Sequence, residues 1–491
     1  MHCTQVHHVP SELLKDIFEE YSSGGNIFGS DMMHVDPLNR QSALVQPAFT
    51  ISAVCKQWRI IALSTPQIWS DLDVYCSSDL SELNKIKLAV DRSGKHPLTI
   101  TIRGQFEQFF DVEAVVFLVQ VSNRWQHLRF FPKGVLVSGT KGYKRLRKAL
   151  SSITSLPILQ SVCTNTVFSS RTVLFPAIKL APLLHRLSIS QAVGIYQLDD
   201  FPLHQVTDLS LSARLYSTHT RSFVAETLQC CKHLVNLELC NTNVRLGWQS
   251  VNPIRVYLPS LRSLSILQDG RYLIDLLNVL SQDMHFPIVS DLEIIVPLTG
   301  FTLPPNLTFQ NAIISLIKNT CLPRNLRSLS LDLGGLPSDV LVTILQHITE
   351  LQHLSLTLPS DGIRDDALYA MCISTSTTQI PILPKLTNLK FGFYHHPQHL
   401  VHKNITSFPL LFSMLKGHRN AATLPRSGCV APLLAAKVVI QLQAQYAPVS
   451  PQRILGDDGL SALSLLKQVM NHFEFVLTYY QMGHGEMVVV I

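Results

Sequence analysis

The sequence predicts an α/β fold in which a small helical module precedes a long array of parallel strands joined by helical or irregular segments. Two short apolar patterns near the N-terminus have the period of a helix. A strand-like leucine pattern then recurs between about residues 125 and 394. With 491 residues, of which 46% are hydrophobic and 15% charged, the chain can bury a large core.

The first helical pattern begins at Pro10, and proline suits the first turn of a helix because its missing N–H costs no hydrogen bond there. The apolar residues that follow fall on one side of a helix: Leu13, Leu14, Ile17, Phe18 and Tyr21. The second pattern keeps a 3.6-residue period for three turns through Ile51, Val54, Cys55, Trp58, Ile61 and Ala62. Ser64 or Thr65 can cap a third short helix that starts at Pro66 and contains Ile68 and Trp69.

Three short amphipathic helices bury little apolar area for the backbone that they order. Such a module therefore buries its remaining apolar surface either on a partner or on the neighbouring array. Periodicity alone leaves these two possibilities open.

Residues 9–18 resemble the opening of an F-box, and residues 54–59, 61–62 and 65–66 with Trp69 resemble its second half. Downstream, residues 91–94 and 96–100 are similar to the continuation found in F-box-like families of mushroom-forming fungi. The resemblance covers about the first hundred residues. It predicts a module over residues 5–75, interrupted by an insertion at residues 22–47 that is rich in glycine and proline. A surface loop of this kind costs little stability but would block the docking face if it folded over it.

F-box proteins dock on the Skp adaptor of a cullin–RING ubiquitin ligase, while the rest of the chain captures a target. By matching position, the resemblance implies that the adaptor is bound by Pro10, Leu13, Leu14, Ile17, Phe18, Val54, Cys55, Trp58, Ile61, Pro66 and Trp69.

After a connecting segment at residues 76–124, we expect a repeat array over residues 125–394. Its unit is an apolar residue, two residues of any kind, a second apolar residue, one of any kind, and a third apolar residue. Eight copies are present: Leu184/Leu187/Ile189, Val206/Leu209/Leu211, Leu234/Leu237/Leu239, Leu261/Leu264/Ile266, Val289/Leu292/Ile294, Leu326/Leu329/Leu331, Leu351/Leu354/Leu356 and Leu386/Leu389/Phe391. Weaker copies begin at Trp125 and at Leu156 or Leu159.

Five of the seven intervals between copies are 22 to 28 residues, and the other two, of 37 and 35, require insertions. This spacing is typical of leucine-rich repeats, whose period is about 20–29 residues. Segments such as residues 272–280 and 340–348 would return the chain to the next strand as helices or irregular turns. An irregular α/β domain is the alternative.

In each unit the last two apolar residues point into the array, while the residues between and before them point outward. The outward set lines the expected concave face and is mostly small hydroxyl residues with a slight acidic excess. The candidate target-binding residues are Arg186, Asp208, Asn236, Glu238, Asp291, Glu293, His353 and Lys390. They favour a protein target with a basic or amide-rich segment. The alternative is that serine simply tolerates a crowded strand surface.

From residue 395 to 491 the repeat pattern is no longer present, and we expect a C-terminal cap and a poorly defined tail. Residues 408–415 and 460–475 are expected to be helical, and residues 487–491 form an apolar strand.

Three other patterns suggest chemistry only weakly. Residues 134–141 nearly form a phosphate-binding loop, but Thr140 and Lys141 stand in the wrong order for one. The histidines at 395, 396, 399 and 402 lack nearby cysteines or carboxylates for zinc. The basic run at residues 141–148 could contact nucleic acid, but a solvated helix face explains it better.

The sequence therefore predicts a non-enzymatic protein with no cofactor or metal. The net charge of +6 is small for this length, no apolar run is long enough for a membrane span, and residues 1–5 do not look like a secretory signal. We expect a protein of the cytoplasm or nucleus, with free thiols at its ten cysteines. The expected function is substrate recognition for an SCF-type ubiquitin ligase. The alternatives are an interaction scaffold with no ligase link and a nucleic-acid binder that uses the basic run at residues 141–148.

Overall fold

The computed structural model describes residues 9–22, 47–76, 80–104, 112–132, 140–165, 176–190, 201–212, 220–240, 255–296, 307–319, 322–333, 338–359, 383–395, 435–444, 464, 472–481 and 485–490. The chain is an α/β protein whose strands are mostly parallel, as the sequence predicts. It divides into two compact units, Met1–Arg214 and Leu215–Ile491. The predicted insertion lies outside the described residues, apart from its ends at Ser22 and Pro47.

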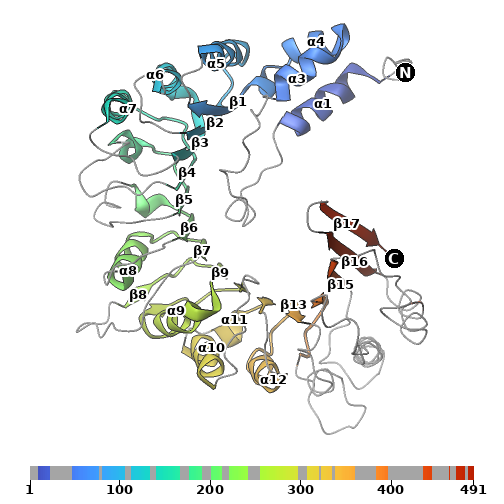
Figure 1. The fold of residues 1–491 in the computed structure, drawn as a ribbon. Helices are drawn as coiled ribbons and strands as arrows, with labels where there is room; N and C mark the ends of the chain where they lie inside the picture. The colour runs from blue at the N-terminus through green and yellow to red at the C-terminus, as the bar shows by residue number, and fades with distance from the viewer. Residues whose placement is uncertain are drawn as a thin grey trace. The chain divides into compact units, whose positions relative to one another are not determined.

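The first unit begins with short helices (Figure 1), namely α1 (Ser11–Ser22), α3 (Pro47–Val54), α4 (Lys56–Leu63) and the 3₁₀ helix η2 (Pro66–Trp69). The third short helix expected at Pro66 is confirmed, but Thr65 makes no side-chain cap. Its hydroxyl instead donates to the carbonyl oxygen of Ile61 at 2.8 Å.

The single helix expected across residues 51–62 is instead two helices that meet at Cys55. Cys55 is extended, with φ −155° and ψ 173°, and its sulfur accepts a hydrogen bond from the backbone N–H of Trp58 at 3.4 Å. Arg59 Nε donates to the carbonyl oxygen of Ser52 at 2.9 Å, which satisfies one of the acceptors left open at the end of α3. The apolar spacing survives this break because both helices pack against the same neighbours.

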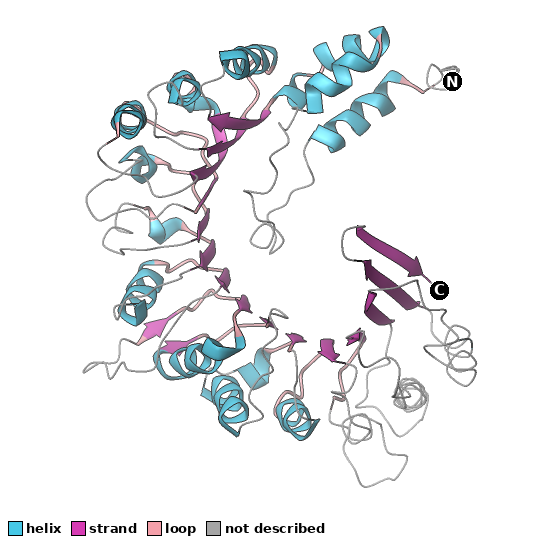
Figure 2. Ribbon diagram, viewed as in Figure 1, coloured by secondary structure: helices cyan, strands magenta, loops and turns pink. Residues whose placement is uncertain are grey.

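The parallel sheet of the first unit follows chain order, each strand pairing with the next. Its strands are β1 (Asp71–Cys76), β2 (Leu98–Gly104), β3 (Trp125–Pro132), β4 (Ser161–Thr164), β5 (Arg186–Ser190) and β6 (Asp208–Ser212). The connections contain α5 (Leu80–Arg92), α6 (Glu113–Val119), α7 (Lys141–Ser151) and the 3₁₀ turns η4 (Ser122–Arg124), η5 (Pro176–Leu180) and η7 (Leu203–Gln205). Figure 2 shows the helices α5, α6 and α7 on one side of these strands.

The sheet begins earlier than the repeat pattern predicts. Residues 76–124, expected to be a connecting segment, contribute α5, β2 and α6, and β1 already pairs with β2 in parallel. The pattern was in fact present at Trp69/Leu72/Val74, and all three side chains are buried. The next copy is harder to see in the sequence because Pro97 occupies its first position.

The second unit has a sheet of the same kind. In chain order its strands are β7 (Asn236–Cys240), β9 (Ser263–Leu267), β11 (Asp291–Ile295), β12 (Ser328–Asp332), β13 (His353–Pro359), β14 (Asn388–His395), β15 (Ala435–Ala444), β16 (His472–Gln481) and β17 (Gly485–Val490). The helices are α8 (Thr220–Cys230), α9 (Gly270–Asp283), α10 (Leu307–Asn319), α11 (Leu322–Asn325) and α12 (Ser338–Gln346). A separate pair of short parallel strands joins β8 (Val256–Tyr257) to β10 (Met284–His285).

Each of the eight apolar patterns coincides with a strand. Its last two apolar residues are at most 2% exposed in every copy. The weaker copy at Trp125 coincides with β3, and Leu159, not Leu156, leads into β4. The helical returns expected at residues 272–280 and 340–348 lie within α9 and largely within α12.

The C-terminal part continues the sheet, which the sequence did not predict. The expected helix at residues 460–475 is wrong at its end, because β16 starts at His472. Alternating aromatic and β-branched residues favour a strand there. The apolar strand expected near the end is confirmed as β17, which pairs antiparallel with β16. Residues 408–415 lie outside the described residues. Among the described helices, none has the length and apolar character needed to cross a bilayer.

The period of two along each strand predicts opposite results for neighbouring substitutions in β12. Leu329 is 1% exposed, so Leu329→Ala should lower the free energy of unfolding by about 2–5 kcal/mol, measured by urea denaturation. Ser330 is its outward neighbour, so Ser330→Ala should change stability by less than about 0.5 kcal/mol. Equal losses for the two variants would contradict the register.

Candidate docking surface and strand face

The helical module of the first unit has its own small core. Its buried apolar members include Leu14, Phe18, Ile51, Ile61, Ala62, Ile68 and Trp69. Trp69 is fully buried, and its indole N–H donates to the carbonyl oxygen of Ala62 at 2.7 Å. The Phe49 ring meets the Trp69 ring edge-on at 5.1 Å, and the Arg92 guanidinium of α5 lies 4.4 Å from its centroid. Trp69 therefore joins the module to α5, the helix that connects the first two strands of the sheet.

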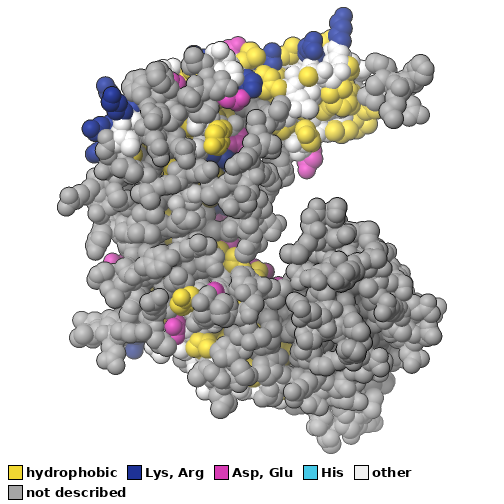
Figure 3. Space-filling view, viewed as in Figure 1, with side chains coloured by type: hydrophobic (Ala, Val, Ile, Leu, Met, Phe, Trp, Pro, Cys, Tyr) yellow, Lys and Arg dark blue, Asp and Glu magenta, His cyan; other side chains and the backbone are white. Residues whose placement is uncertain are grey.

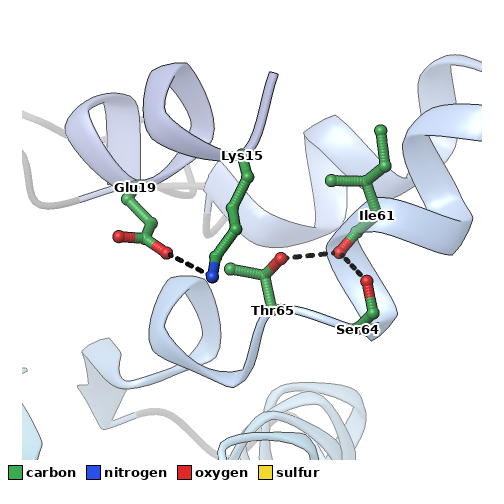
Figure 4. Close-up of polar contacts among 5 residues, drawn as sticks. All are labelled: Lys15, Glu19, Ile61, Ser64 and Thr65. Carbon is green, nitrogen blue, oxygen red and sulfur yellow. Dashed lines mark hydrogen bonds and ion pairs between the residues drawn. The ribbon is translucent and has the colours of Figure 1, made fainter. Parts of the chain in front are cut away.

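Polar contacts fix the ends of these helices (Figure 4). The carbonyl oxygen of Ile61 accepts hydrogen bonds from the hydroxyls of Ser64 at 3.0 Å and Thr65 at 2.8 Å, so the end of α4 is closed. Lys15 and Glu19 form an ion pair along α1 with an N–O distance of 3.7 Å. Both side chains of this pair are well exposed, so it adds little stability.

The module also leaves large apolar side chains in solvent. On α1, Leu13, Ile17 and Tyr21 are 53, 56 and 60% exposed and stand at spacings of four residues, which places them in one stripe. The buried stripe of the same helix is Leu14, Phe18 and Ser22. Three further exposed apolar side chains come from α3 and α4: Val54, Ile60 and Leu63.

We call these six residues the exposed apolar set: Leu13, Ile17, Tyr21, Val54, Ile60 and Leu63. In the space-filling view hydrophobic side chains gather over these N-terminal helices (Figure 3). Single exposed apolar residues are ordinary, but several on one small module mark a surface that binds another molecule.

The structure divides the predicted adaptor-binding residues into three groups. Pro10, Leu13, Ile17 and Val54 are exposed, while Cys55, Trp58 and Pro66 are partly exposed. The remaining four, Leu14, Phe18, Ile61 and Trp69, are buried in the module core and hold its helices together. Sequence matching could not separate these groups, because neighbouring apolar residues of α1 are about 100° apart around the helix and differ in exposure. It also missed Tyr21, Ile60 and Leu63, which only the orientation of each helix reveals.

Trp58 contributes to packing but leaves one group unsatisfied. Its ring centroid lies 4.8 Å from that of Phe18, with the planes 58° apart. Its indole N–H is buried and has no hydrogen-bond partner among the described residues. An unpaired buried donor costs about 1–3 kcal/mol, so the position of this indole lowers the stability of the module.

The outward residues of the second unit align in register rows across its strands. The first row contains Asn236, Ser263, Asp291, Ser328, His353 and Asn388. The second contains Glu238, Ser265, Glu293, Ser330, Ser355 and Lys390. The six candidate target-binding residues of this unit therefore share one strand face. The outward positions of β9 and β12 are serines, and these two strands separate the candidates on β7, β11 and β13.

Hydrogen bonds tie several of these side chains to their neighbours. Ser265 donates to a carboxylate oxygen of Glu293 at 2.8 Å, and Ser290 donates to Asp291 at 2.5 Å. The amide nitrogen of Asn388 lies 2.6 Å from Nδ1 of His353. Of the outward serines, Ser265 therefore helps to orient Glu293, and Ser290, which precedes β11, orients Asp291.

The remaining two candidates, Arg186 and Asp208, face each other on β5 and β6 of the first unit, 3.7 Å apart. Further charged residues lie on this strand face. Asp71, Asp73 and Arg103 were missed because β1 and β2 were not recognised, and His127 and Arg129 because β3 was seen only as a weaker copy. Arg103 Nε lies 3.2 Å from a carboxylate oxygen of Asp73.

Partial burial alters the titration of two groups on this face. Burial raises the pKa of Asp71 to about 6; the Arg129 charge opposes this shift and the Asp73 charge adds to it. Burial, with help from Arg129, Arg186 and His185, lowers the pKa of His127 to about 4. Nδ1 of His127 lies 2.8 Å from the hydroxyl oxygen of Ser161, so this ring is neutral and hydrogen-bonded at pH 7.

The structure explains the phosphate-loop-like pattern and the basic run by ordinary helix packing, as far as their residues are described. Thr140 caps α7 by accepting a hydrogen bond from the Tyr143 N–H at 3.2 Å, while residues 134–139 lie outside the described residues. On α7 the basic side chains are exposed or partly exposed, opposite the buried Leu146 and Leu150, and Arg145 pairs with Glu113. Of the histidine cluster only His395, the last residue of β14, is described.

No protein-family model matches this chain, and a search of curated proteins finds no significant match.

The Asp71 carboxyl generates a pH prediction. The pKa of this carboxyl in the folded protein, about 6, lies above its usual value of 3.8. Between pH 3.8 and about 6 the folded protein therefore keeps a proton that the unfolded chain has lost. The stability of the wild type should therefore fall as pH rises from about 4 to 7, relative to Asp71→Asn, by roughly 1–3 kcal/mol. Urea denaturation of both proteins at several pH values measures the difference. Parallel pH profiles would contradict the burial of this carboxyl.

Proposed function

We propose that this protein is a substrate-recognition subunit of an SCF-type cullin–RING ubiquitin ligase. In this proposal the N-terminal helices are an F-box-like module that docks on the Skp adaptor, and the strands form a leucine-rich-repeat solenoid that holds a protein target. The observation that carries the proposal is the exposed apolar set on a module whose core is otherwise closed.

The apolar stripe of α1 supports a docking role because the helix does not need it for its own packing. Leu14 and Phe18 already fix α1 on the module, so Leu13, Ile17 and Tyr21 remain for a partner. Fully burying one such side chain contributes about 1.5–3 kcal/mol, so several together can offset much of the cost of association. The partner must present an apolar groove, as helix-in-groove recognition requires.

The proposed mechanism is proximity. A target bound on the strand face would be held near the ligase, which raises its effective concentration for ubiquitin transfer. In the second unit Glu238, Asp291 and Glu293 make the outward face locally acidic, which favours a basic or amide-rich segment of the target. The chain itself performs no covalent chemistry in this scheme.

The alternative is an interaction scaffold with no ligase link, in which the helices only close the end of the first sheet. The contact of Trp69 with Arg92 of α5 favours this alternative, because it joins the module to the first helix that follows it. The two proposals differ in what they require of the exposed apolar set, and this difference can be tested.

We expect Ile17→Asp and Leu13→Asp to abolish capture of a purified Skp adaptor in a pull-down, because each places a charge in an apolar contact. Both side chains are more than half exposed, so thermal unfolding should be unchanged within about 0.5 kcal/mol. Leu14→Asp is unsuitable here, since Leu14 is 3% exposed and its loss would unfold the module.

The matched control is Leu183→Asp, which alters an exposed leucine of the same unit outside the module. It should leave adaptor capture intact. A stably folded wild type that does not bind the adaptor, or an Ile17→Asp variant that binds normally, would favour the scaffold alternative.

Reversing the acidic strand face should abolish target capture. The variant carries Asp291→Lys and Glu293→Lys, and the measured quantity is the yield of partners recovered by affinity purification with mass spectrometry. The control variant, Asp91→Lys with Glu226→Lys, changes the net charge equally at two helix surfaces. Unchanged recovery in the strand-face variant would remove this face from target recognition.

A further inference from the structure

A second polar feature of the second unit lies at the edge where its strands begin. A cavity of about 520 Å³ opens there, and it is lined by Arg262, Ile288, Ser290, Arg324, Asn325, Arg327, Glu350, Gln352 and Lys385. We call this cavity the basic edge pocket. None of its residues belongs to the outward strand positions or to the helical module.

The backbone places the pocket residues at regular intervals. Arg262, Ser290, Arg327 and Gln352 each stand one residue before a strand. The carbonyl oxygen of Arg262 accepts from the N–H of Ser290 at 2.9 Å, and that of Ser290 accepts from Arg327 at 2.8 Å. Adjacent strands are about 4.8 Å apart, so the backbones of Arg262 and Arg327 stand roughly 10 Å apart on either side of Ser290. Two long guanidinium side chains at this separation can close on one small group between them.

The charges of the pocket do not balance. Lys385 pairs with Glu350 at 2.5 Å, which cancels those two charges. The exposed Arg262, Arg324 and Arg327 form no ion pair with any described residue, so three positive charges remain. Like charges gathered around one cavity attract an anion, and a bound anion would stabilise the folded unit.

Neutral donors and an apolar wall complete the pocket. The amide nitrogen of Asn325 donates to the carbonyl oxygen of Pro287 at 2.6 Å, which orients the side chain and leaves its second N–H available. The Gln352 amide makes no side-chain hydrogen bond to a described residue. Ile288 is 41% exposed and offers an apolar contact beside these polar groups.

We propose that the basic edge pocket binds a phosphate monoester. A carboxylate occupies one arginine fork, whereas a monoester dianion has three terminal oxygens that three guanidinium groups can share. The volume leaves room for the group that carries the phosphate, and Ile288 would contact its apolar part. The carrier is either a small molecule or a phosphorylated side chain, since both present the same dianion. All the residues lie in the second unit, so the inference does not depend on adaptor docking.

The test uses the full chain and two probes at fixed ionic strength: a short peptide with one phosphoserine, and inorganic phosphate. We expect the phosphopeptide to bind in isothermal titration calorimetry and its unphosphorylated form not to bind. Arg262→Gln and Arg327→Gln should each weaken binding at least tenfold. Arg327→Lys keeps the charge but loses the fork, so it should weaken binding by less than Arg327→Gln.

The matched control is Arg255→Gln, which removes an exposed arginine before β8, outside the pocket, and should change affinity less than twofold. Inorganic phosphate should compete with the peptide. Binding of the peptide much more tightly than inorganic phosphate would identify a phosphorylated protein as the source, and similar affinities would identify a small phosphate compound. Equal binding of the unphosphorylated peptide, no binding of either probe, or equal losses in Arg255→Gln and Arg327→Gln would overturn the proposal.

Discussion

The fold depends on one constraint, the burial of two apolar side chains from each short parallel strand. A strand of five residues, such as β9 or β12, cannot form a core alone. Stacked on its neighbours in register, it places Leu264 above Leu292 and Leu292 above Leu329, and each of these side chains is almost completely removed from solvent. The inward positions are therefore fixed as apolar, whereas the outward and edge positions are free to vary in charge.

The N-terminal helices show the same contrast between buried apolar positions and exposed positions. Trp69 is wholly buried and satisfies its N–H on Ala62, so it fixes the module without exposing any part of itself. Ile17, one helical turn from buried residues on the same helix, is more than half exposed. A module this small cannot bury both faces of α1, and the face left over is the one that a partner can use.

Much of the architecture could be predicted from the sequence because its strongest signal is local. Three apolar residues at fixed spacing were sufficient to locate the strands from Leu184 to Phe391. The apolar pattern did not reveal a strand where one residue belonged to two patterns at once. Trp69 was assigned to the helical module, and it also starts the first strand pattern of the sheet. Pro97 stands where an aliphatic residue would have marked the next strand. The break at Cys55 left the apolar period intact, so no pattern could reveal it.

The candidate sites could be predicted only in part, because exposure is a tertiary property. Leu13 and Leu14 are identical in type and adjacent in sequence, yet they are 53% and 3% exposed. The basic edge pocket was invisible for a different reason. Arg262 precedes β9, Arg324 lies in α11 and Lys385 precedes β14, so these residues are far apart in the sequence and become neighbours only in the folded unit.

Opposite charges lie close together in the second unit without cancelling. Asp291 follows Ser290 in the chain, yet its carboxylate accepts from the Ser290 hydroxyl and pairs with none of the pocket arginines in the described structure. Arg262 and Arg327 stand one residue before their strands, whereas Asp291 stands at an outward position of β11. An acidic face and a basic edge can therefore coexist a few ångströms apart. Among the described residues no ion pair joins the two, because the backbone decides where these side chains point.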